Sequence, residues 1–84
     1  MKKDEYKIIS LAIEVFIKSE NGVQLATYAG ETYDELLAAV KQDEREGMLK
    51  ILREPERGYL VEYKDVPGVQ VFASEKALEE KRNE

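Results

Sequence analysis

The sequence predicts a small α+β domain in which about five antiparallel strands form one sheet and one main helix packs on one face of it. Three observations lead to this prediction. Several segments rich in β-branched residues have alternating apolar positions, one segment has helical spacing after a helix-start signal, and short turn motifs separate the strands. The expected order is ββαβββ followed by a short C-terminal helical turn. Residues 1–84 are expected to form a single domain, with frayed ends at 1–5 and 79–84.

The first element, residues 6–18, is the hardest to assign. On a strand, its odd positions from Ile9 to Ile17 form an unbroken apolar face. On a helix, its polar positions would line one narrow stripe, so periodicity alone does not decide. Its β-branched residues and the turn motif Glu20-Asn21-Gly22 that follows favour a strand, and a helix is the alternative.

The turn motif predicts a hairpin with a three-residue loop, in which Gly22 takes the left-handed conformation. Ser19 would then lie opposite Val23, and Ile17 opposite Leu25. The odd positions of both strands would share one apolar face.

The main helix has the clearest local signals. Thr32 is a predicted N-cap, and Glu35 three residues later completes a capping box. Gly47 is the predicted C-terminal glycine of the helix. Four apolar residues give one stripe at helical spacing: Tyr33, Leu36, Leu37 and Val40.

Three more strands are predicted, at residues 49–53, 59–63 and 69–73. The cluster at 54–58 is expected to be a turn, and Pro67-Gly68 fits the centre of a type II turn. Ser74 is expected to cap a short helix that runs through Leu78 and then fades.

Composition excludes several kinds of chemistry. The chain has no His and no Cys, which removes the usual neutral-pH base, the thiol nucleophile and metal sites built on nitrogen or sulfur ligands. We therefore expect no enzyme activity, no cofactor and no metal. The net charge of −5 argues against a general nucleic-acid binder. Without cysteines, a signal peptide or a membrane-spanning segment, a cytoplasmic location is expected.

The first strand is a candidate binding surface because its even face is also partly apolar, with Tyr6, Ile8 and Phe16. A strand that is apolar on both faces is normally covered on both. One helix covers one face, so either the C-terminal turn with Leu78 covers the other or a partner does. Its first half, residues 6–11, either pairs with a C-terminal strand or overhangs.

A second candidate is the strand with Tyr59, Val61 and Tyr63 on one face. Tyrosine is enriched at protein interfaces because it combines apolar area with a polar tip. With the nearby Arg57 and Lys64, these rings suggest nucleic-acid stacking as a minority alternative.

A third candidate is the acidic middle of the chain, where residues 31–56 hold eight acidic and four basic residues. Glu44 falls near the centre of the apolar stripe of the helix. Either this stripe reaches solvent at that point, or Glu44 meets a basic group of a partner.

These features favour a non-enzymatic protein–protein interaction module, a small acidic adaptor or inhibitor that forms homodimers. Its expected partners are another protein, its own second copy, or both. A nucleic-acid-binding regulatory domain that uses the tyrosine strand with Arg53, Arg57 and Lys64 is the first alternative. A structural or designed scaffold without a ligand is the second. A phage or mobile-element origin would suit such a protein, although no single residue points there.

Overall fold

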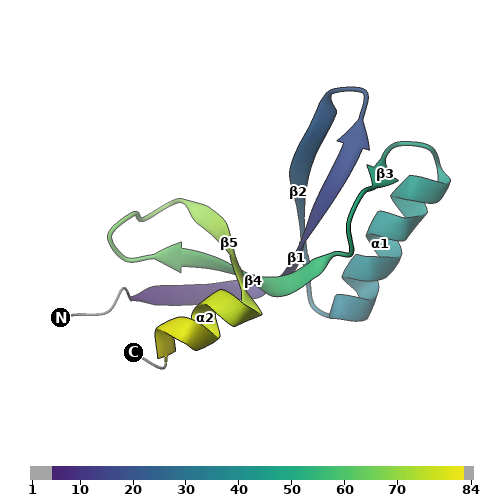
Figure 1. The fold of residues 1–84 in the computed structure, drawn as a ribbon. Helices are drawn as coiled ribbons and strands as arrows, with labels where there is room; N and C mark the ends of the chain where they lie inside the picture. Colours follow the sequence, from purple (N-terminus) through teal and green to yellow (C-terminus); the bar gives the residue numbers. More distant parts are fainter. Residues whose placement is uncertain (1–4, 83–84) are drawn as a thin grey trace.

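The computed structural model describes residues 5–82, and its elements follow the predicted order (Figure 1). They are β1 (Tyr6–Ser19), β2 (Gly22–Gly30), α1 (Tyr33–Arg45), β3 (Lys50–Ile51), β4 (Glu56–Tyr63), β5 (Gln70–Ser74) and α2 (Glu75–Arg82). The sheet is antiparallel, with the strand order β2-β1-β4-β5 and with β3 paired to β1. The α+β class is therefore confirmed. Of the ends expected to fray, 1–5 and 79–84, residues 1–4 and 83–84 lie outside the described residues.

The long strand β1 organises the whole sheet. Its C-terminal part pairs with β2 through residues 11–19, and its N-terminal part pairs with β4 through residues 6–14. The strand assignment of this segment is thus confirmed, and its first half pairs with a C-terminal strand. In Figure 1, the β1–β2 hairpin and α1 form one end of the molecule, and β4, β5 and α2 form the other.

The predicted register of the hairpin is wrong by one residue. Gly22 does take the left-handed conformation, with φ 98°, but it pairs with Ser19 and does not belong to the loop. The loop has two residues, and the Ser19 hydroxyl accepts a hydrogen bond of 3.3 Å from the Asn21 N–H inside it. A one-residue change of register moves every side chain of the partner strand to the other face.

The corrected register decides which β2 side chains reach the core. Val15 lies opposite Ala26 and Ile13 opposite Tyr28, so the even positions of β2 share a face with the odd positions of β1. Leu25 lies opposite Phe16 on the other face, where Leu25 is 59% exposed.

A β-bulge interrupts the apolar face of β1 that was predicted to be unbroken. The pairing with β4 shifts between Ile8 and Ser10, so that Ile8 lies opposite Val61 and Leu11 opposite Tyr59. Val61 and Tyr59 are two residues apart on β4, so they lie on the same face of the sheet. Their partners Ile8 and Leu11 therefore also share that face. The bulge therefore replaces Ile9 by Ile8 on the face that carries the core.

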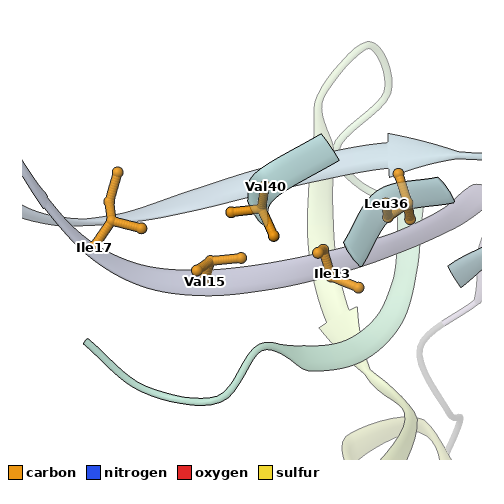
Figure 2. Close-up of a cluster of buried hydrophobic side chains, with 5 residues drawn as sticks. All are labelled: Ile13, Val15, Ile17, Leu36 and Val40. Carbon is orange, nitrogen blue, oxygen red and sulfur yellow. The ribbon is translucent and has the colours of Figure 1, made fainter. Parts of the chain in front are cut away.

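Helix α1 packs on this face above the hairpin. Figure 2 shows Leu36 and Val40 directed from the helix toward side chains of β1. The buried cluster consists of Ile13, Val15, Ile17, Leu36 and Val40. The Thr32 hydroxyl accepts a hydrogen bond of 3.2 Å from Glu35 N–H, and Gly47 ends the helix with φ 80°. Both predicted helix boundaries are confirmed.

Helix α2 covers the same face at the other end of the sheet. Its Leu78 is buried against Val61 and Ala73. Val61 lies on the same face of β4 as Tyr59, and Tyr59 lies opposite Leu11 on the core face of β1. Of the two alternatives for the opposite face of β1, the one in which Leu78 covers it is therefore wrong. Both helices lie on one side, and no helix among residues 5–82 covers the other face of the sheet.

The C-terminal half differs from the prediction in its element lengths. β3 has two paired residues, although five were expected, and β4 begins at Glu56 within the predicted turn at 54–58. α2 continues to Arg82, well past the predicted single turn. The Ser74 hydroxyl accepts a hydrogen bond of 3.0 Å from Ala77 N–H, as its predicted capping role requires.

Candidate functional site

A groove lies between α2 and the N-terminal half of β1. It has a volume of about 250 Å³. Its lining residues are Tyr6, Ile8, Tyr59, Glu75, Leu78 and Glu79. We call it the tyrosine groove. Three of the residues predicted to bind a partner from the sequence, Tyr6, Ile8 and Tyr59, meet there.

The wall of the groove formed by the sheet follows from strand geometry. Tyr6 lies opposite Tyr63 and Ile8 opposite Val61, so all four share a face with Tyr59. Without the bulge at Ile9, the alternation along β1 would turn Tyr6 and Ile8 to the other face.

The wall formed by α2 consists of Glu75, Leu78 and Glu79, which are spaced three and four residues apart and therefore share one helical face. Leu78 is buried and holds the helix on the sheet. The two glutamates beside it are exposed. This wall thus combines an apolar base with two carboxylates.

Tyr63 and Val61, the other two members of the predicted tyrosine strand, pack against residues of the groove but do not line it. Tyr63 packs edge-on against Tyr6, with ring centroids 5.9 Å apart and an interplanar angle of 63°. Val61 is fully buried beneath α2. A partner that docks in the groove would contact Tyr6, Ile8 and Tyr59, and would not reach Val61.

The electrostatics of the groove are acidic. No basic side chain is among its six lining residues.

Burial, together with the negative charge of Glu75 and the nearby Tyr59, raises the pKa of Tyr33 to about 12, although Arg57 acts in the opposite direction. The Tyr33 hydroxyl donates a hydrogen bond of 2.7 Å to the Gly58 carbonyl oxygen, which ties α1 to this end of the sheet.

Phe16, also predicted to bind a partner, lies far from the tyrosine groove in the register of β1 and on the opposite face. Another groove of about 400 Å³ is found there. Its lining residues are Glu14, Phe16, Leu25, Arg53, Glu54 and Glu56. The Arg53 guanidinium lies over the Phe16 ring, 5.4 Å from its centroid. We call this second surface the Phe16 surface.

Glu44 reaches solvent, as one of the two sequence-based interpretations expected. Its carboxylate accepts a hydrogen bond of 2.8 Å from the Ile51 N–H at β3. The structure therefore gives Glu44 a partner within the chain, and separates it from the residues of both grooves.

Arg57 and Lys64, two of the three basic residues of the nucleic-acid alternative, interact within the chain, as Arg53 does with the Phe16 ring. Lys64 forms an ion pair of 2.8 Å with Glu5, and the hydrogen bond to this carboxylate raises the pKa of Lys64. The Arg57 guanidinium lies 5.1 Å from the centroid of the Tyr33 ring. Neither residue lines the tyrosine groove, where the charged residues are Glu75 and Glu79.

Sequence reasoning missed Glu75 and Glu79 as site residues. Their spacing around Leu78 was a usable signal, since an apolar residue with acids on the same helical face predicts an acidic wall. What the pattern lacked was the position of the helix, which depends on contacts with distant strands.

Comparison with protein-family models, curated proteins and solved structures returned no match to this chain. Among the described residues, no helix has the length and apolarity needed to cross a membrane. Within residues 5–82, no group of three or more acidic, His or Cys side chains is arranged to hold a metal ion.

Proposed function

We propose that this chain is a non-enzymatic protein–protein interaction module, a small acidic adaptor or inhibitor that binds another protein through the tyrosine groove. The observation that carries the proposal is the convergence of Tyr6, Ile8 and Tyr59 beside α2. Ile8 is 52% exposed there, and exposed apolar area flanked by tyrosine rings is typical of binding surfaces.

The use of the hydroxyl groups supports a non-enzymatic role. The side chains of Ser19, Thr32 and Ser74 each accept a hydrogen bond from a backbone N–H at a turn or a helix start. With no His or Cys in the sequence, these hydroxyls have no imidazole base to activate them. A cytoplasmic location remains part of the proposal, supported by the cysteine-free sequence.

Self-association through the Phe16 surface is the second part of the proposal. Leu25 and Val23 are more than half exposed beside Phe16, on the face of the sheet opposite α1 and α2. The same surface has both signs of charge, with Arg53 close to Glu54. A two-fold dimer brings each patch against its own copy, so Arg53 of one copy would meet the carboxylates of the other.

The groove is tested by affinity capture from a lysate of the source cells, with and without nuclease, using the wild type, Ile8→Glu and Val66→Glu. Val66 is 49% exposed in the β4–β5 connection, which makes it a matched control for a new surface charge. We expect one stoichiometric protein partner that survives nuclease, is retained by Val66→Glu and is lost with Ile8→Glu.

Undiminished capture by Ile8→Glu would exclude the tyrosine groove as the binding site. Recovery of untagged copies of this chain alone would instead support a self-assembling structural protein. Loss of the partner on nuclease treatment would favour the nucleic-acid alternative.

A further inference from the structure

We propose that the tyrosine groove binds an extended segment of a partner protein that adds to β1 as an extra strand and carries basic side chains at alternate positions. This inference rests on the proposed function and specifies the chemistry of the partner. It joins three features that lie together: an open strand edge, an aromatic and apolar groove beside it, and two carboxylates on the far wall.

The open edge belongs to the N-terminal half of β1. β4 pairs with one edge of β1 from Tyr6 onward, whereas β2 pairs with the other edge only from Leu11 onward. No strand among residues 5–82 pairs with that second edge at Tyr6–Ser10.

The direction of the backbone groups at this edge follows from one hydrogen bond. The Lys64 N–H donates to the Glu5 carbonyl oxygen at 3.0 Å, so the backbone of Glu5 faces β4. Because these groups alternate in direction along a strand, the N–H and C=O of Tyr6 and Ile8 face the open side. They are available to an added strand.

The side chains along this edge make it a suitable template. Ile8 is 52% exposed and Ile9 36% exposed. Ile8 lines the groove, and the open stretch ends at Ser10 because β2 pairs with this edge from Leu11 onward. An open edge with exposed apolar side chains readily pairs with another strand, and strand addition combines backbone hydrogen bonds with side-chain contacts.

The charge of the groove selects a basic occupant. Glu75 and Glu79 are four residues apart on α2, a rise of about 6 Å. Side chains on one face of a strand repeat about every 6.6–6.8 Å. Two Lys or Arg residues at alternate positions of the added strand would therefore match the two carboxylates, with their stems against Tyr6 and Tyr59.

A second copy of this chain fits the edge poorly. Antiparallel pairing of two β1 edges would bring the acidic walls of both copies to neighbouring positions on one face of the joined sheet. Glu75 and Glu79 of one copy would then face like charges, which opposes association.

The test uses a synthetic, end-capped eight-residue peptide in which arginine and valine alternate, titrated into the ¹⁵N-labelled full chain. We expect saturable amide shifts centred on Tyr6–Ser10, and slower hydrogen exchange at the Tyr6 and Ile8 amides. The double variant Glu75→Gln/Glu79→Gln should bind about tenfold more weakly, which is the effect of two partly exposed ion pairs.

Two controls separate strand addition from general attraction to an acidic chain. Glu20→Gln/Glu35→Gln removes the same charge from exposed positions outside both the tyrosine groove and the Phe16 surface, and should leave the affinity close to that of the wild type. A peptide with the same side chains but N-methylated at alternate amides cannot form the added ladder, and should lose binding at the β1 edge.

Equal weakening by both double variants would overturn the proposal, as would full binding of the N-methylated peptide. Absence of shifts at Tyr6–Ser10 with the arginine–valine peptide would also overturn it. That last result would leave the proposed function standing if Ile8→Glu still abolished capture of a natural partner, so the two failures are distinguishable.

Discussion

Gly58 shows how a single residue can determine the contact between two strands. The sequence placed it in a turn cluster, but it lies inside β4, opposite Ala12 of β1 and Ser74 of β5. An added Cβ there would collide with the Ala73 carbonyl oxygen, lie 2.7 Å from Cζ of Phe72 and lie 2.8 Å from Cα of Ser74. The absence of a side chain is what allows β5 to approach β4 so closely.

We therefore predict that Gly58→Ala destabilises the chain by about 3 kcal/mol, at the upper end of the usual cost of overpacking, because two of the obstructing atoms belong to the backbone of β5. Urea unfolding would measure the change. Gly30→Ala is the matched control, since its Cβ would meet only the flexible side chain of Leu36, at 2.9 Å. Equal losses for the two variants would contradict this explanation.

At the scale of elements, α1 and the hairpin are joined by more than the apolar cluster. The Tyr28 hydroxyl of β2 donates a hydrogen bond of 2.7 Å to the Asp43 carboxylate of α1. Burial, this hydrogen bond and the charge of Asp43 raise the pKa of Tyr28 to about 12. The phenol is held in its protonated form by the docked helix.

This link predicts a loss of stability at alkaline pH. In the unfolded chain, the Tyr28 pKa returns to about 10, so between pH 10 and 12 the unfolded state binds fewer protons than the folded state. The free energy of unfolding contributed by Tyr28 is therefore complete below pH 10, and falls as pH rises toward 12.

The variant Tyr28→Phe should lose about 1 kcal/mol at pH 8 with its hydrogen bond, and should then fall less steeply than the wild type above pH 10. Urea titrations at a series of pH values would compare the two slopes. Tyr33, whose pKa is also raised to about 12, is present in both proteins, so parallel curves for wild type and variant would show that Tyr28 is not the titrating group.

At the scale of the whole molecule, the chain is elongated, with extents of 46 × 25 × 20 Å. Two separate buried clusters lie on the same side of the sheet, one under each helix. This one-sided arrangement leaves Phe16, Val23 and Leu25 together on the other side. The proposed dimer would cover this apolar area.

We predict that the wild type sediments at twice the mass of the chain at high concentration, and that Leu25→Glu shifts it to a monomer by placing a charge in the centre of the Phe16 surface. Val66→Glu, which adds the same charge elsewhere, should remain dimeric. Sedimentation velocity over a concentration series would measure this. A monomeric wild type throughout, or a dimer unaffected by Leu25→Glu, would refute association through this surface.

The local features of this protein were determined by its sequence. The Thr32 cap, the end of α1 at Gly47, the order of elements along the chain and the shared face of Tyr59 and Tyr63 all depend on backbone preferences and periodicity within a few residues. These features can be predicted because helix capping, the left-handed conformation of glycine and the alternation of side chains along a strand each depend on only a few neighbouring residues.

The tertiary structure alone decided the register of the hairpin, the bulge at Ile9 and the position of α2. A strand has a side-chain period of two, so one residue more or less in a turn or a bulge moves its side chains to the opposite face of the sheet. The sequence pattern is compatible with both arrangements. Packing between distant segments selects one of them. The tyrosine groove depends on that selection, because Tyr6 and Ile8 face α2 only when the bulge and the docked Leu78 are both in place.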